Sequence, residues 1–212
     1  MYKYVKRLGD IIVALVLITV SIVPMLIVAI AIKIESKGPV IYKSKRMGKD
    51  MIPFNVYKFR TMICDRKELD TNLKHEDIVT KVGKFIRKTS IDELPQLFNI
   101  LKGEMTFIGP RPWILEYYAI FNEHQKRRVE VKPGISGLAQ AKGRNGLNIF
   151  KKIEYDIEYI DNISFKEDIY IVWITILTVF SKDNAEITES GIKDELSQLK
   201  EKMKDKTELL KN

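Results

Sequence analysis

The chain has 212 residues, of which 36 are basic and 28 are acidic, so its formal net charge is +8. This charge favours anionic partners, namely nucleic acid, anionic lipid or phosphorylated small molecules, and a hydrophobic content of 45% excludes a wholly disordered protein. Cys64 is the only cysteine, which excludes an intrachain disulfide, and the isolated His75 and His124 give no reason to expect zinc.

The first feature along the chain is a run of 22 residues without a charge, from Ile11 to Ile32. As one helix it reaches about 33 Å, enough to cross a hydrocarbon core of about 30 Å. The run is longer than the apolar part of a signal peptide, and no small-residue cleavage site follows it. We therefore expect this segment to remain on the protein as a membrane helix.

Both flanks of this run are basic, with Lys3, Lys6 and Arg7 before it and Lys33, Lys37, Lys43, Lys45 and Arg46 after it. The positive-inside tendency favours a cytoplasmic position for both flanks, which suits a re-entrant helix, whereas the length also suits a straight crossing. Pro24 supplies a place to bend, and Ser21 is positioned to satisfy backbone groups that Pro24 frees. The residues by themselves leave both topologies open.

The next segment predicts a β-hairpin, with strands at 40–42 and 53–59 and a turn at 47–50. It carries several cations, which suit either a basic surface at the lipid headgroups or the binding of an anionic ligand. Lys58 and Arg60 are the more specific pair, because they flank an aromatic residue at a strand end.

An acidic pair, Asp92-Glu93, stands where a helix is predicted to begin. Ser90 and Glu93 match the S-x-x-E capping box, so capping alone is one explanation. Pro95 is tolerated in a first helical turn, which predicts a helix from about Asp92 to Leu101 that ends at a glycine cap. A helix N-terminus attracts phosphate, and basic residues including Arg87 arrive just before it, so a metal-assisted phosphoryl reaction is the other explanation.

A short strand at 105–108 is followed by Gly109-Pro110-Arg111-Pro112. The two prolines restrict the backbone, so Arg111 is either a presented binding residue or simply part of a rigid turn. The remaining chain predicts a helix at 114–124, loops at 131–138 and 139–146, an amphipathic helix at 148–162, an apolar helix at 169–180 that is buried or interfacial, and a short helical seam at 192–203.

Several of these segments together resemble the bacterial sugar transferase family, the monotopic phosphoglycosyl transferases. The resemblance runs to about Asn184 and is carried by KFRTM (58–62), TSIDELPQLFN (89–99), GEMTFIGPRP (103–112), KPGISGLAQ (132–140) and GRN (143–145). It implies transfer of sugar 1-phosphate from a UDP-sugar to polyprenyl phosphate, with release of UMP, as the first membrane step of surface glycan synthesis. It also implies a re-entrant membrane helix, although Val23 stands where the family often has serine before the proline.

The resemblance also assigns roles. Asp92 is implied as the nucleophile that forms a phosphosugar intermediate, with Glu93 as its partner in Mg²⁺ binding or in the second step. Arg87 matches a phosphate-binding arginine. Arg111 and Arg144 are implied donor-site cations, with Lys58 and Arg60 as further phosphate contacts.

These observations predict an α+β, mostly helical fold. The expected parts are a re-entrant membrane helix at 1–36, a cytosolic catalytic domain with a hairpin and interfacial helices at 37–184, and a charged helical extension at 185–212. The expected location is the cytoplasmic face of a bacterial plasma membrane, with a homodimer or glycan-assembly proteins as further partners. A non-enzymatic adaptor that binds anionic lipid and a partner protein is the alternative, and no motif supports nucleic-acid binding. No residue pattern identifies the sugar.

Overall fold

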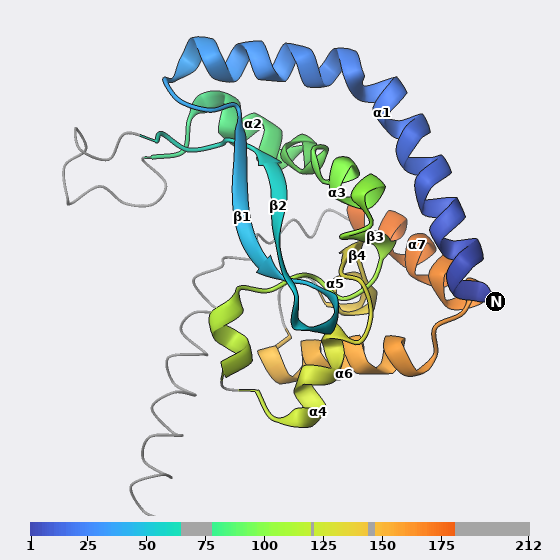
Figure 1. Ribbon diagram of the computed structural model, residues 1–212. Helices are drawn as coiled ribbons and strands as arrows, with labels where there is room; N and C mark the ends of the chain where they lie inside the picture. Colours follow the sequence, from blue (N-terminus) through green and yellow to red (C-terminus); the bar gives the residue numbers. More distant parts are fainter. Residues whose placement is uncertain (65–77, 120, 144–146, 181–212) are drawn as a thin grey trace, which may run out of the picture. The chain divides into compact units, whose positions relative to one another are not determined.

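The computed structural model describes residues 1–64, 78–119, 121–143 and 147–180. Within these residues the fold is α+β and mostly helical, as predicted, with two short two-stranded sheets (Figure 1). The described chain forms two compact units. The first comprises Lys3–Lys45 and Phe54–Met105, and the second comprises Arg46–Pro53 and the described residues from Thr106 onward. The predicted boundaries at residues 36 and 184 stay predictions.

The chain opens with a long apolar helix, α1 (Tyr2–Glu35), which extends the predicted charge-free run into both basic flanks. Pro24 lies inside the helix, and the helix axis bends along its course (Figure 1). Proline lacks an N–H, so one helical hydrogen bond is missing there. The hydroxyl of Ser21 donates to the carbonyl of Leu17 at 2.6 Å. The sequence suggested that Ser21 would compensate for the bond lost at Pro24, but its hydroxyl bonds elsewhere. Hydrogen bonds from a serine hydroxyl to the carbonyl four residues earlier also bend helices.

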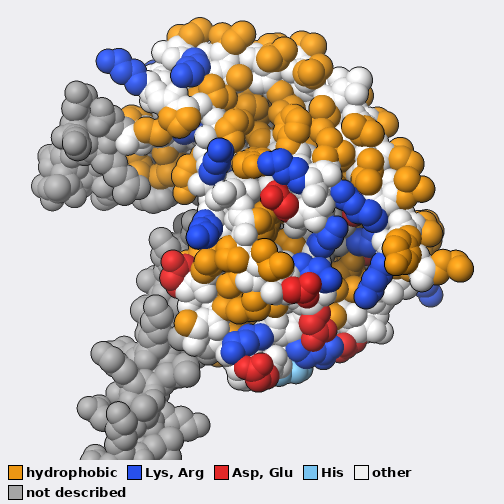
Figure 2. Space-filling model, in the orientation of Figure 1, with side chains coloured by type: hydrophobic (Ala, Val, Ile, Leu, Met, Phe, Trp, Pro, Cys, Tyr) orange, Lys and Arg blue, Asp and Glu red, His pale blue; other side chains and the backbone are white. Residues whose placement is uncertain are grey.

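Most of the large apolar side chains of α1 are exposed, and Figure 2 shows hydrophobic side chains gathered along this helix. By length and composition α1 is able to cross a membrane. Its C-terminal half is partly buried, because Val28 and Ile32 pack with Phe59 and Ile86 in the core of the first unit. One face of α1 thus packs against the first unit, and its larger apolar face is exposed.

Both ends of α1 are hydrogen-bonded to the body of the first unit. Near the N-terminal end, the guanidinium of Arg7 donates to the carbonyls of Ile100 and Leu101 at 2.6 and 2.9 Å. At the C-terminal end, the carboxylate of Glu35 accepts from the first two backbone N–H groups of α2 (Lys81–Lys88) at 2.6 and 2.9 Å. These contacts hold the two ends of one long helix against the same unit.

The predicted hairpin is present, formed by β1 (Ile41–Met47) and β2 (Pro53–Phe59) around a short 3₁₀ turn, η1 (Lys49–Met51). β1 is longer than the sequence suggested. The side chain of buried Asn99 bonds to the β2 backbone, donating to the carbonyl of Asn55 at 2.7 Å and accepting from the N–H of Tyr57 at 3.0 Å. It satisfies polar groups of β2 that would otherwise need water.

The helix predicted from Asp92 to Leu101 is divided in two. A 3₁₀ turn, η2 (Ile91–Glu93), precedes α3 (Gln96–Lys102), and Pro95 is the residue before the first turn of α3. Gly103 ends α3 with φ 84°, the left-handed cap conformation expected of this glycine. Asp92 therefore lies in a separate turn before the helix, and the prediction that it begins the helix was wrong.

The second unit is built on two parallel strands, β3 (Thr106–Ile108) and β4 (Gly134–Ser136), in which Thr106 pairs with Gly134 and Ile108 with Ser136. The sequence predicted β3 but treated the segment of β4 as a loop. The short β4 has too few residues to show an alternating pattern, so its strand conformation follows from pairing with β3.

Two other predictions for the second unit needed correction. The helix predicted at 114–124 is replaced by η3 (Leu115–Ala119) and α4 (Glu123–Lys126), because Asn122 and Gln125 form a capping box that starts a new helix. The helix α5 (Leu138–Lys142) occupies most of the described part of the loop predicted at 139–146. The 3₁₀ turn η4 (Arg127–Val129) follows α4 directly.

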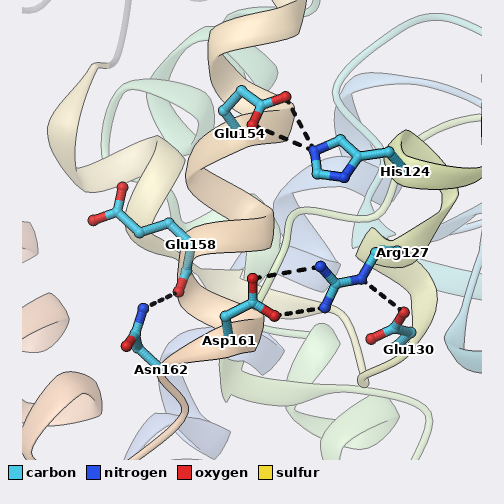
Figure 3. A network of polar contacts seen from close by, with 7 residues as sticks. All are labelled: His124, Arg127, Glu130, Glu154, Glu158, Asp161 and Asn162. Atoms are coloured by element: carbon cyan, nitrogen blue, oxygen red, sulfur yellow. Dashed lines mark hydrogen bonds and ion pairs between the residues drawn. The ribbon is translucent and has the colours of Figure 1, made fainter.

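The amphipathic helix predicted at 148–162 is confirmed as α6 (Ile149–Asp161), capped by the side chain of Asn148. Its outer face carries an ion pair between Asp161 and Arg127, and Nε2 of the exposed His124 lies 3.4 Å from the Glu154 carboxylate (Figure 3). The final described helix is α7 (Phe165–Phe180). In α7 Ile171 is fully buried whereas Trp173 is 60% exposed, so the helix is partly buried and partly uncovered. His75 and the predicted extension at 185–212 lie outside the described residues.

Candidate active site

Asp92 is a buried carboxylate in η2, with 9% of its surface exposed. Burial is the main reason that the pKa of Asp92 rises above its ordinary value. The charge of Lys58 opposes this rise, the charge of Glu93 adds to it, and the charge of Arg87 opposes it. The first unit thus brings together four of the predicted site residues, and Asp92 is the most buried carboxylate among them.

Glu93 forms an ion pair with Lys58, whose Nζ donates to Oε1 at 2.6 Å. Both side chains are about a quarter exposed, at 22% and 27%. The predicted capping box of Ser90 and Glu93 is absent, because Ser90 has a left-handed backbone with φ 57° and its side chain makes no cap hydrogen bond. The ion pair to β2, rather than capping, fixes Glu93 beside Asp92.

Arg87 lies in the last turn of α2, five residues before Asp92. Its Nε donates to the hydroxyl of Thr61 at 2.9 Å, and its charge acts on the Asp92 carboxyl. An arginine offers a planar fork of donors that matches phosphate oxygens. Together, Lys58 and Arg87 place two cations near a desolvated carboxylate, a combination suited to drawing a phosphate toward a nucleophile.

Arg60 is placed differently, although it follows Lys58 by only two residues. It is buried, and its guanidinium donates to the carbonyls of Ser36 and Lys37, each at 2.6 Å, and to the Ser36 hydroxyl at 3.0 Å. These groups follow the C-terminus of α1, where a cation is favoured by the helix dipole. Because the terminal guanidinium nitrogens of Arg60 donate to these backbone carbonyls, we do not assign Arg60 to the phosphate-binding site, although the sequence predicted that role.

Arg111 belongs to the second unit, where its side chain is exposed and its backbone is held firmly. The carbonyl of Arg111 accepts from Nη2 of Arg128 at 2.9 Å, and the carbonyl of Pro110 accepts from the N–H of Gly134 at 2.9 Å. These two bonds fix the backbone at Pro110 and Arg111, and the donor-site role of Arg111 stays a prediction. Arg144, the other predicted donor-site cation, lies outside the described residues.

Arg128 and Asp156 are residues whose importance the sequence reasoning missed. Their side chains are buried and paired, with Nη2 of Arg128 2.6 Å from Oδ2 of Asp156. Arg128 also contacts two aromatic residues: its Nη1 donates to the hydroxyl of Tyr118 at 3.1 Å, and its guanidinium carbon lies 3.7 Å from the ring centroid of Trp113. One sequence signal was present: Asp156 lies between Ile153 and Ile157 on the apolar face of α6, where an unpaired charge is costly.

The predicted metal ligands are Asp92 and Glu93. Within the described residues, no group of three or more His, Cys, Asp or Glu side chains is close enough to hold a metal. Mg²⁺ commonly binds one or two carboxylates and completes its shell with water and substrate phosphates. Two adjacent carboxylates are the donor type that such Mg²⁺ binding uses, and Mg²⁺ at Asp92 and Glu93 stays a prediction.

Residues 1–182 match the family model described as bacterial sugar transferase. The chain belongs to the bacterial sugar transferase family. This transferase is 42% identical over 183 residues to the uncharacterized sugar transferase EpsL of Bacillus subtilis (strain 168), with 86% of this chain and 91% of EpsL covered.

Two further relatives of the transferase are named UDP-glucose:undecaprenyl-phosphate glucose-1-phosphate transferase. The protein from Klebsiella pneumoniae is 44% identical over 192 residues, which cover 85% of this chain and 41% of the relative. The protein from Caulobacter vibrioides is 37% identical over 190 residues, which cover 85% of this chain and 71% of the relative. This transferase therefore spans less than half the length of the Klebsiella protein.

Proposed function

We propose that this transferase moves sugar 1-phosphate from a UDP-sugar to polyprenyl phosphate and releases UMP. The observation that carries the proposal is the buried Asp92 carboxyl, on which the charges of Lys58 and Arg87 act, with Glu93 next to it in the chain and paired with Lys58. The names of the Klebsiella and Caulobacter relatives support the same class of reaction. A sugar nucleotide donor and a lipid phosphate acceptor also suit a basic protein with a long apolar helix.

In the proposed first step, a carboxylate oxygen of Asp92 attacks the phosphorus that carries the sugar. The bond from that phosphorus to the bridging oxygen breaks, and UMP leaves with the electron pair. In the second step, an oxygen of polyprenyl phosphate attacks the same phosphorus, and the carboxylate of Asp92 is released. The products are the polyprenyl diphosphate sugar and the regenerated enzyme.

The neighbouring residues have distinct proposed roles. Arg87 binds a phosphate oxygen of the donor, and Lys58 orients Glu93 while lowering the negative charge that faces the diphosphate. Asp92 and Glu93 would hold Mg²⁺, which supplies charge neutralisation on the diphosphate when it is bound. Arg111, whose backbone is hydrogen-bonded within the second unit, is kept as a proposed phosphate-binding residue.

The decisive experiment compares Asp92→Asn with Asp161→Asn, a matched change at an exposed position on α6. Purified protein in detergent is incubated with Mg²⁺, undecaprenyl phosphate and a panel of UDP-sugars, and UMP is measured. We expect Asp92→Asn to abolish UMP release while Asp161→Asn retains it. Full turnover by Asp92→Asn would exclude the nucleophile assignment, and release of UMP with only one donor would identify the sugar.

We also propose that α1 is re-entrant and that both of its ends lie on the cytoplasmic face of a bacterial inner membrane. The hydrogen bonds of Arg7 and Glu35 to the first unit support this, because a straight helix of 34 residues would be about 51 Å long and would separate its ends across a bilayer. The basic flanks support the cytoplasmic side.

The topology is tested with single cysteines at Tyr4 and Ile34, which are 84% and 81% exposed, in a Cys64→Ser background. A membrane-impermeant thiol reagent is applied to intact cells and to inverted membrane vesicles. A re-entrant helix predicts labelling of both positions in inverted vesicles only. Labelling of one position from each side would show a straight crossing.

A further inference from the structure

Thr61 is hydrogen-bonded to residues at both ends of α2, the helix that carries Arg87. It is buried, with 7% of its surface exposed, and its hydroxyl accepts from Nε of Arg87 at 2.9 Å. Its carbonyl accepts from the N–H of Thr80, the residue that caps the other end of α2, at 3.1 Å. One residue outside α2 therefore contacts both the start of the helix and the functional side chain in its last turn.

The backbone of α2 is already restrained without the Thr61 hydroxyl. The carboxylate of Glu35 accepts from its first two N–H groups, and the hydroxyl of Thr80 accepts from the N–H of Gly83 at 2.9 Å. Gly83 also lies directly against Thr61, because a Cβ at this position would be 2.2 Å from the Thr61 carbonyl oxygen. The helix backbone thus has several supports that a change of the Thr61 side chain leaves in place.

The side chain of Arg87 has more conformational freedom than this backbone, since Arg87 is an exposed residue with several rotatable bonds. Its bond to Thr61 uses Nε and not the two terminal NH₂ groups, which form the fork that binds a phosphate. Holding Nε restricts the direction of that fork. We propose that Thr61 is a positioning residue, which fixes the guanidinium of Arg87 for binding the donor diphosphate beside Asp92.

The segment around Thr61 is itself well fixed. The preceding residue, Arg60, is held by the backbone carbonyls that follow α1, and the preceding strand, β2, is held by Asn99. A hydroxyl on such a segment is a rigid reference point for a flexible arginine, and pre-ordering a binding group removes an entropy cost from binding. This inference rests on the proposed function, because it assigns a purpose to the orientation of Arg87.

The test is a double-mutant cycle in kcat/KM for UMP release, measured with Mg²⁺, undecaprenyl phosphate and the UDP-sugar that gives the fastest release in the panel described above, in detergent. Thr61→Val keeps the side-chain shape and removes the acceptor, and we expect a loss of about 10- to 100-fold, the range for one hydrogen bond to a charged group. Thr61→Ser keeps a hydroxyl and should recover most of this loss. In an Arg87→Ala background, Thr61→Val should cause no further loss, because it acts through Arg87.

A merely structural role makes a different prediction. Thr61→Val would then lower kcat/KM by the same factor in the wild-type and Arg87→Ala backgrounds, and this result would overturn the proposal. An unchanged kcat/KM for Thr61→Val in the wild-type background would overturn it too. Thr89→Val is the matched control, since Thr89 is the exposed residue that follows α2 directly and its hydroxyl donates to the carbonyl of Phe85. If Thr61→Val fails to fold, Thr61→Ala removes the hydroxyl without a steric conflict and completes the cycle.

The same experiment separates this inference from the proposed function. Loss of activity in Arg87→Ala with full activity in Thr61→Val would overturn only the positioning role of Thr61. Absence of UMP release from the wild-type protein with every UDP-sugar would overturn the proposed function itself.

Discussion

Changing Asp156 to Asn should cause a large loss of stability, because it removes one charge from a buried pair. The side chains of Arg128 and Asp156 are only 1% and 3% exposed, and two donors of Arg128 share one oxygen of Asp156 at 2.6 and 3.1 Å. Removing one partner leaves the other charge uncompensated in the core, which typically costs about 3–5 kcal/mol. For a chain of this size that loss corresponds to a fall in Tm of about 6–20 °C.

The control uses the same substitution on the same helix. Asp161 pairs with Arg127 on the surface of α6, where the two side chains are 51% and 35% exposed (Figure 3). Water and salt screen this pair, so Asp161→Asn should lower Tm by only a small fraction of the change at Asp156. Both variants are followed by thermal unfolding of purified protein in detergent.

Equal falls in Tm for the two variants would refute the reasoning, because burial would then not determine the cost. A further variant tests the mechanism directly. Replacing both charges with apolar residues, as in Arg128→Met with Asp156→Leu, should recover part of the lost stability, since neither partner is then left charged in the core. Failure of any recovery would show that the contacts of Arg128 with Tyr118 and Trp113 matter more than the ion pair.

Three further predictions follow from the first unit. In chelator, Asp92→Asn should unfold at an equal or higher temperature than the wild type at neutral pH, because burial raises the pKa of Asp92 and its ionised form costs stability above that pKa. The difference in Tm should shrink as the pH is lowered toward 3.8, the ordinary pKa of an aspartate, because the folded wild type then takes up the proton first. A lower Tm for the variant at neutral pH would contradict this account. Chelation should abolish UMP release, and added Mg²⁺ should restore it, whereas full turnover in chelator would exclude the metal assignment. Arg60→Lys should lower Tm by several degrees although it keeps the charge, because a single ammonium does not replace the donors that reach both Ser36 and Lys37. An unchanged Tm would show that the guanidinium contacts add little to stability.

The comparison of Lys58 with Arg60 shows where sequence reasoning stopped. Both are cations in one short motif, and the sequence suggested phosphate binding for each. In the structure Lys58 pairs with Glu93 of η2, whereas Arg60 binds the backbone that follows α1. Nothing within the motif distinguishes these roles, because the partners lie 35 and 24 residues away along the chain. Tertiary contacts alone made the distinction.

Local patterns were reliable where the decisive interactions are local. The charge-free run predicted α1, the spacing of apolar residues predicted α6, and the glycine after α3 predicted its cap. The sequence also determined the family, because several motifs occur in one order along the chain. Each of these features depends on residues within a few positions of one another or on their order alone.

The tertiary structure decided the surroundings of the acidic pair. By sequence, Ser90 and Glu93 formed a plausible capping box, but the left-handed backbone of Ser90 and the ion pair of Glu93 with Lys58 give the pair another setting. The burial of Asp92 likewise depends on packing of the first unit around η2. A carboxylate becomes reactive or inert through its solvation and its neighbouring charges, and folding sets both by bringing distant residues together.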